Sequence, residues 1–168
     1  MLLRTKGNLI DMAEQGLFDV IVHGCNCQNT MGSGIAKEIR ERYPRAYDAD
    51  TLFTSNIKMN GGSPIVKLGN YSYTDHQKKD VFSPSSFTII NAYTQVNYLP
   101  RGVDHFEYES FQLILRKLAA TYVGMRFGFP FIGMGLAGGD SKRIIAMLED
   151  FATRVTEAGG TVTLVEFG

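Results

Sequence analysis

Short apolar runs alternate with longer amphipathic segments along most of this chain. The apolar runs predict strands at about 2–6, 19–23, 65–73, 87–93, 127–132 and 161–167. In the longer segments, apolar residues recur at spacings of three and four. This spacing predicts helices at about 7–15, 34–43, 107–123 and 141–158.

Strands and helices that alternate in this way indicate an α/β fold, with a mixed central sheet and helices on both faces. Pro44 is expected to end the helix before it, because proline cannot continue a helix. We expect residues 45–63 to be irregular and residues 74–85 to form a solvated loop. The chain has no repeat, linker or low-complexity tract, so residues 1–168 are expected to form one domain.

Composition narrows the classes of partner. The chain carries 17 basic and 17 acidic side chains and has a formal net charge of zero, so bulk charge gives no nucleic-acid footprint. No apolar run approaches the ~20 residues that span a bilayer, and no signal peptide precedes the first polar residues. We therefore expect a cytoplasmic protein, monomeric, without a nucleic-acid or membrane partner.

The two cysteines, Cys25 and Cys27, are separated by one residue. A disulfide between them would be strained and would close almost no loop, so we expect reduced thiols that line a loop. Zinc would need about four ligands, and the three histidines are scattered along the chain. We expect no bound metal and no resident cofactor; a redox or metal role for the thiols is the alternative.

Residues 20–43 join a buried strand to an amphipathic helix through a polar loop that contains Gly32 and Gly34. A glycine-rich turn at this place brings backbone N–H groups and the positive end of a helix dipole to one point, which suits a phosphate. An ordinary strand-to-helix turn is the alternative, since glycine is common in turns.

A second glycine cluster, residues 133–139, also follows a predicted strand and precedes a predicted helix. Its glycines fit the dinucleotide pattern GxGxxG, but too little chain follows to build the fold that holds NAD. In open α/β sheets, ligands bind beyond the carboxyl ends of the strands. Both glycine loops should therefore lie on one rim, and two such loops facing one cleft suggest a diphosphate ligand.

Together these motifs resemble the macro domain family, which binds ADP-ribose. The similar segments are 7–10 (Gly-Asn-Leu-Ile), 22–26 (Val-His-Gly-Cys-Asn), 32–36 (Gly-Ser-Gly-Ile-Ala) and 132–138 (Ile-Gly-Met-Gly-Leu-Ala-Gly). Within the family, the sequence motifs of this chain are similar to those of the fungal ADP-ribose 1″-phosphate phosphatases and their phage and bacterial relatives. The resemblance implies a three-layer α/β/α fold and, as partner, ADP-ribose or a derivative.

The resemblance also implies a set of ligand-binding residues. Asn8 stands where the family has an aspartate that holds the adenine amine, and Asn26 would bind hydroxyls of the distal ribose. As alternatives, Asn8 is a helix N-cap and Asn26 fixes its own loop. Ala137 stands where many relatives have an aromatic side chain, which leaves the cleft more open. The full implied set is Asn8, Leu9, Asn26, Gly32, Ser33, Gly34, Ile35, Gly133, Met134, Gly135, Leu136, Ala137 and Gly138.

Two residues are implied to be catalytic. His23 stands where most macro domains have asparagine and where the phosphatase group has histidine; an imidazole can transfer a proton or attack phosphorus near neutral pH. A half-buried histidine satisfied by backbone groups is the alternative. Asp140, which follows the second glycine loop, could activate water or could simply cap the next helix.

The activity implied by this resemblance is hydrolysis of ADP-ribose 1″-phosphate to ADP-ribose and phosphate. Removal of ADP-ribose from an acidic side chain, deacetylation of O-acetyl-ADP-ribose, binding without turnover and a nicotinamide-dependent oxidoreductase are the alternatives. The strand end at 92–95 (Ala-Tyr-Thr-Gln) carries no lysine, which argues against a mechanism through a lysine adduct.

Overall fold

A mixed sheet forms the centre of the molecule. The computed structural model describes residues 1–78, 85–100, 103–135 and 137–168. The strands within these residues are β1 (Leu2–Gly7), β2 (Val20–Asn26), β3 (Tyr71–Lys78), β4 (Ser85–Gln95), β5 (Arg126–Phe129) and β6 (Thr161–Phe167). Their order is β1-β6-β5-β2-β4-β3; neighbouring strands run parallel, except that β3 is antiparallel to β4.

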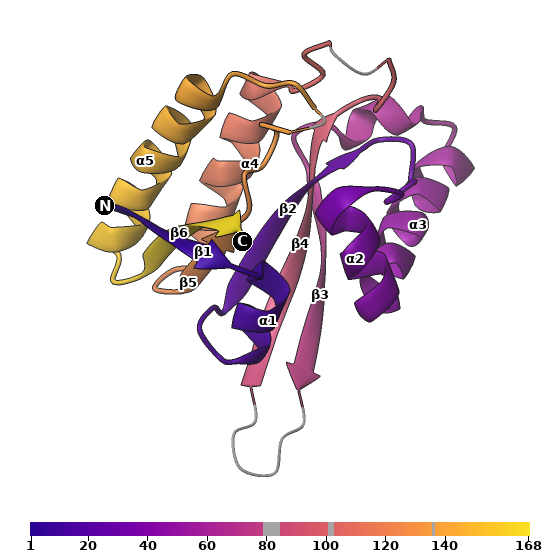
Figure 1. The fold of residues 1–168 in the computed structure, drawn as a ribbon. Helices are drawn as coiled ribbons and strands as arrows, with labels where there is room; N and C mark the ends of the chain where they lie inside the picture. The colour runs from indigo at the N-terminus through magenta and orange to yellow at the C-terminus, as the bar shows by residue number, and fades with distance from the viewer. Residues whose placement is uncertain (79–84, 101–102, 136) are drawn as a thin grey trace.

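Helices cover both faces of this sheet. They are α1 (Leu9–Glu14), α2 (Gly34–Arg42), α3 (Pro44–Met59), α4 (Tyr108–Thr121) and α5 (Ser141–Glu157), with a short 3-10 helix η1 (Pro64–Lys67). Figure 1 shows α4 and α5 on one side of the sheet and α2 and α3 on the other. The predicted α/β fold with three layers and a mixed sheet is confirmed.

The two faces of β2 serve two separate cores. Side chains alternate across a strand, so Val20 and Val22 pack among the residues of α4 and α5. Ile21 and Cys25 pack on the other face, among residues of α1, α2 and α3. A central parallel strand buried on both faces explains why its sequence begins as an uninterrupted apolar run.

The prediction that residues 45–63 are irregular is wrong, because most of them form α3. Pro44 does end α2 at Arg42, but it also occupies the first turn of α3, where a missing N–H has no cost. The buried positions of α3 are Ala46, Asp50 and Thr54. They recur every four residues as a helix requires, but two of them are polar, so a search for apolar periodicity misses the helix.

The region after α3 also differs from the prediction. Residues 65–73 were expected to form a strand, but residues 64–67 form η1 and β3 begins only at Tyr71. In the segment 74–85, which was expected to be a loop, residues 74–78 continue β3 as far as Lys78. Residues 79–84 lie outside the described residues. β3 lies at the edge of the sheet, where polar side chains are tolerated and the apolar signal is weak.

A buried ion pair joins α3, η1 and β4. Lys67 Nζ lies 2.7 Å from Asp50 Oδ1, and both side chains are almost completely buried. Lys67 Nζ also donates to Thr54 Oγ1 at 2.7 Å, and Tyr93 OH donates to the same Asp50 oxygen at 2.8 Å. Buried charges persist only when they are paired and hydrogen-bonded, so these contacts fix the position of α3 on the sheet.

No helix in the described residues is both long and apolar enough to cross a membrane.

We predict that Lys67→Met lowers the free energy of unfolding by about 3–5 kcal/mol, because it leaves the Asp50 carboxylate buried without a cation. Urea denaturation at pH 7 measures the change. Lys58→Met, in the exposed last turn of α3, is the matched control and should change the free energy by less than about 0.5 kcal/mol. Similar small effects of both variants would contradict the structural role of the pair.

Candidate functional site

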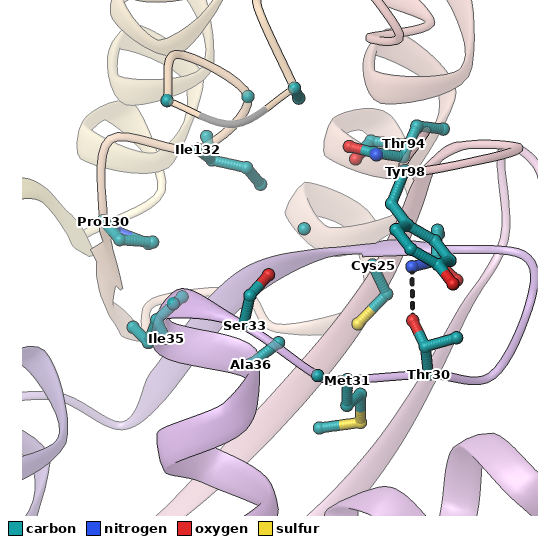
Figure 2. A pocket seen from close by; sticks show the side chains of 18 of the residues that line it. Cys25, Thr30, Met31, Ser33, Ile35, Ala36, Thr94, Tyr98, Pro130 and Ile132 are labelled. Carbon is teal, nitrogen blue, oxygen red and sulfur yellow. Dashed lines mark hydrogen bonds between the residues drawn. The ribbon is translucent and has the colours of Figure 1, made fainter. Parts of the chain in front are cut away.

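A cleft of about 580 Å³ lies beyond the carboxyl ends of β2, β4 and β5 (Figure 2). This volume suits a ligand of nucleotide size. Both glycine loops contribute to its lining, with Gly32–Gly34 from one loop and Gly133 and Gly135 from the other. The expectation that the two loops meet across one cleft therefore agrees with the structure.

The first glycine loop leads into the N-terminus of α2. Ser33 is the N-cap residue, and its side chain makes no capping hydrogen bond. The first N–H groups of a helix lack partners within the helix, and here the residues that carry them, Gly34, Ile35 and Ala36, line the cleft. With the positive end of the helix dipole, this geometry favours an anion.

The second glycine loop is only partly open to the cleft. Gly133, Gly135 and Ala137 line it, whereas Met134 packs against the α4/α5 core. The N–H of Gly138 donates to the carbonyl of Gly135 at 3.0 Å, so it is already bonded within the loop. Leu136 lies outside the described residues.

Glycine at 133 is required by the surrounding structure. Its φ is +74°, and an added Cβ would lie 2.3 Å from the ring of Phe106. Gly34 also has a positive φ, +57°, but nothing lies within 4 Å of its added Cβ. Glycine at 133 is therefore required both by its φ and by its close packing against Phe106, whereas glycine at 34 is favoured by its φ alone.

The side chains of Asn8 and Asn26 already have hydrogen-bond partners within the protein, and Asn8 Nδ2 donates to Glu38 Oε1 of α2 at 3.1 Å. Asn8 Oδ1 accepts from the Asp11 N–H at 3.0 Å and caps α1, and Asn8 does not line the cleft. Asn26 does line it, but its Nδ2 donates to Thr30 Oγ1 at 2.8 Å, the dashed line in Figure 2. Its Oδ1 accepts from the Gln28 N–H, so both alternatives, the helix cap and the self-fixed loop, describe the geometry. Leu9 is a buried core residue.

The expected position of His23 at the cleft is not what the structure shows. The side chain is 1% exposed and is not part of the lining, because Cys25, on the same face of β2, lies two residues closer to the rim. Its Nε2 lies 2.6 Å from Asn91 Oδ1. Asn91 Nδ2 donates to Ala46 O and Ser72 Oγ, so the Asn91 oxygen is left to accept and His23 carries its proton on Nε2.

Burial governs the charge of His23 and of the thiol above it. Desolvation lowers the pKa of His23 from 6.5 to about 4, against a smaller opposing effect of the hydrogen bond with Asn91. Cys25 Sγ lies 3.6 and 3.7 Å from the two ring nitrogens, and burial raises its pKa well above the ordinary value. At neutral pH the pair is therefore an uncharged imidazole and a thiol. Cys25 and Cys27 are both free, as expected from their spacing.

Asp140 caps α5. Its Oδ1 accepts from the backbone N–H groups of Lys142 and Arg143, at 3.0 and 3.3 Å, and the residue is exposed outside the cleft lining. This is the geometry of the capping alternative. A catalytic role for His23 or Asp140 stays a prediction.

Sequence reasoning missed several residues of the lining. Thr94 and Gln95 form the carboxyl end of β4 and Tyr98 follows it, so the rule that places ligands there could have found them. Asp50 comes from α3, which was expected to be irregular, so no signal pointed to it. Tyr98 supplies an aromatic side chain to a cleft that Ala137 was expected to leave open (Figure 2). Within the described residues, no group of three or more His, Cys, Asp or Glu side chains could hold a metal ion.

Comparison with known proteins gives two sequence relatives of different extent. The chain is 27% identical over 154 residues to an uncharacterized 17.5 kDa protein of Enterobacteria phage T4, and the match covers 89% of each chain. It is 38% identical over 96 residues to an ADP-ribose 1″-phosphate phosphatase of Ajellomyces capsulatus. That match covers 56% of this chain and only 35% of the phosphatase. No protein-family model matches.

Solved structures settle the fold. The macrodomain of Mycobacterium tuberculosis DarG superposes with a TM-score of 0.72, over 97% of both chains at 18% identity. A macrodomain protein from Streptomyces coelicolor gives a TM-score of 0.70 over the whole of both chains, at 22% identity. The chain has the macro domain fold.

A further macro domain structure contains a nucleotide. The Trypanosoma brucei macrodomain in complex with ADP-ribose gives a TM-score of 0.56, at 14% identity, over 99% of this chain and 63% of that one. At such low identities the likeness concerns the fold alone. The resemblance predicted from the sequence is thus confirmed for the macro domain architecture, and the ligand of this protein must be argued from its own cleft.

We predict that His23 makes the stability of this protein fall in mild acid. In the unfolded chain its imidazole binds a proton below pH 6.5, but in the folded protein only near pH 4, so stability is complete above pH 6.5 and is lost as the pH falls. Between pH 7 and pH 5 this amounts to about 2 kcal/mol of unfolding free energy.

Urea denaturation of wild type and His23→Gln at both pH values measures this effect. Between pH 7 and pH 5, the unfolding free energy of His23→Gln should decrease by about 2 kcal/mol less than that of wild type. The control His105→Gln should show the same decrease as wild type. Identical pH dependence in wild type and His23→Gln would show that the histidine is not buried in its neutral form.

Proposed function

We propose that this macro domain binds ADP-ribose or a derivative in the cleft at the carboxyl ends of β2, β4 and β5. The convergence of two glycine loops on one cleft, one of them at the N-terminus of α2, carries this proposal. The volume of the cleft suits a nucleotide diphosphate sugar. The macrodomain of Trypanosoma brucei, a structural neighbour, is described in complex with ADP-ribose, which supports the same ligand.

For the activity, we propose hydrolysis of ADP-ribose 1″-phosphate to ADP-ribose and phosphate. The support is the 38% identity of a 96-residue segment to a phosphatase of this type. Backbone N–H groups around the cleft would stabilise negative charge on the terminal phosphate of the substrate. Binding of the diphosphate would position this terminal phosphate for attack by water. In this proposal His23 is a positioning residue, because a neutral, buried imidazole behind Cys25 does not reach the cleft.

The ligand is tested with two variants of Gly135, a cleft residue with nothing within 4 Å of an added Cβ. Gly135→Asp should bind ADP-ribose at least about 10-fold more weakly than Gly135→Asn, because the two differ only in a charge placed beside the diphosphate. Isothermal titration calorimetry measures both affinities and that of wild type. No heat with wild type, or equal affinities of the two variants, would contradict the proposed site.

The activity is tested on the wild-type protein with a panel of substrates. Phosphate release from ADP-ribose 1″-phosphate should exceed turnover of O-acetyl-ADP-ribose and of ADP-ribosylated acidic side chains. ADP-ribose binding without turnover of any of the three would instead select a non-catalytic reader.

The two roles of Asp140 separate in one pair of variants. Asp140→Ala should lower the free energy of unfolding by about 1 kcal/mol, while Asp140→Asn should preserve it, because asparagine also caps helices. If Asp140 only caps α5, phosphate release by Asp140→Asn equals that of wild type. Turnover lost in Asp140→Asn at unchanged stability would instead show that the carboxylate takes part in the reaction.

A further inference from the structure

Two buried polar atoms at the cleft lack a hydrogen-bond partner. Among the buried side-chain nitrogen and oxygen atoms of residues 1–78, 85–100, 103–135 and 137–168, these are Asp50 Oδ2 and Thr94 Oγ1. Both residues are 1% exposed, and both line the cleft. Buried polar atoms in folded proteins almost always have a partner. Two exceptions that belong to one cleft indicate that a bound molecule supplies the missing partners.

The rest of the Asp50 carboxylate is fully occupied. Its Oδ1 accepts from Lys67 Nζ at 2.7 Å and from Tyr93 OH at 2.8 Å. Tyr93 OH is in turn 2.7 Å from Ser72 Oγ, and Lys67 Nζ donates to Thr54 Oγ1. These contacts fix the plane of the carboxylate, while Lys67 balances its charge. Oδ2 therefore remains as a rigid acceptor that is shielded from competing water.

The helix that carries Asp50 also holds the first glycine loop. Tyr47 OH donates to Asn29 O at 3.1 Å, and Thr51 Oγ1 donates to Asn29 Oδ1 at 3.2 Å. Both donors lie on α3, within one turn of Asp50. The acceptor and the segment that leads into Gly32 are thus positioned by the same helix, as parts of one site.

The chemistry of the free oxygen selects its partner. A carboxylate only accepts hydrogen bonds, and an ionised phosphodiester oxygen also only accepts, so Asp50 does not bind the diphosphate. A hydroxyl can donate. In a ligand of the ADP-ribose class, the adenine amine and the ribose hydroxyls can donate. A hydroxyl is the single group among these that can both donate to Asp50 Oδ2 and accept from the unpaired Thr94 Oγ1, which favours a ribose hydroxyl.

We infer that Asp50 is a specificity-determining residue, whose Oδ2 accepts a hydrogen bond from a ribose hydroxyl of the bound ligand. This inference rests on the proposed function, which supplies the ligand class. It assigns to α3 a part in ligand recognition. It also gives the buried ion pair a role besides stability, because the contact with Lys67 holds the Asp50 carboxylate in a fixed orientation at the cleft.

The decisive variant changes the acceptor into a donor. Tyr93 OH donates to Oδ1 and keeps this place when Lys67 is replaced, so in the variant with Asp50→Asn the amide oxygen accepts from Tyr93 and the NH₂ group takes the place of Oδ2. Because Asp50→Asn alone leaves Lys67 without its counter-charge, the test uses Asp50→Asn combined with Lys67→Met. Thr54→Val is the matched control: Thr54 bonds to Lys67 but does not line the cleft.

Calorimetry measures the affinity for ADP-ribose. Displacement of ADP-ribose by inorganic pyrophosphate measures the affinity for a ligand that has no sugar hydroxyl. Thermal melting first establishes that each variant is folded. The double variant should bind ADP-ribose about 10–100-fold more weakly than wild type, the range expected for a lost charge-assisted hydrogen bond. Its affinity for pyrophosphate, and the affinity of Thr54→Val for both ligands, should stay within about 3-fold of wild type.

Three results would overturn the inference. The first is unchanged ADP-ribose affinity in the double variant. The second is an equal loss for ADP-ribose and pyrophosphate, which would indicate a general change in the cleft. The third is an equal loss in Thr54→Val, which would indicate a structural role of the network. Wild type that binds no ADP-ribose at all would overturn the proposed function itself, so the two failures are distinct.

Discussion

The parallel alignment of β2, β4 and β5 is the constraint on which the rest of this structure depends. Parallel neighbours place their carboxyl ends on one edge of the sheet, so the segments that leave them open onto the same space. Gly34 and Gly135 are distant in the chain, yet both line one cleft for this reason. The antiparallel β3 lies at the edge of the sheet and leaves this alignment undisturbed.

Beneath the cleft, on the α3 side of the sheet, lies a connected layer of polar side chains. Hydrogen bonds run from His23 through Asn91 and Ser72 to Tyr93, and from Tyr93 to Asp50. Such a network is costly to bury unless its members satisfy one another. The oxygen that stays unsatisfied belongs to Asp50, the member that lines the cleft. The network therefore combines two roles, rigidity of the floor and one acceptor left for a ligand.

This layer also changes how His23 is understood. From the sequence, a histidine at the end of a strand beside two glycine loops is expected to act as a proton donor. Period-two alternation places it on the same face as Cys25, however, and the ring is sealed behind that residue. Its low pKa follows from burial, so it is a neutral member of the network rather than an acid at the cleft.

Much of this architecture could be predicted from the sequence, because apolar periodicity reports the burial that defines most of the elements. Residues 87–93 and 144–155 show this directly. The method failed at α3, whose buried face carries Asp50 and Thr54, and this failure also hid Asp50 as a cleft residue. The glycine loops could be located because clusters of glycine between a predicted strand and a predicted helix are visible in the sequence. The direction of His23 and the capping bonds of Asn8 and Asp140 depend on tertiary contacts that one sequence does not display.

The most direct test of the central claim is a two-dimensional ¹H–¹⁵N NMR titration of the wild-type protein with ADP-ribose. The account predicts large shifts of backbone amide signals in both loops, at 32–36 and at 133–137, at the same ligand concentration. Shifts confined to one loop, or located away from the carboxyl ends of β2 and β5, would show that the two loops do not hold a ligand between them.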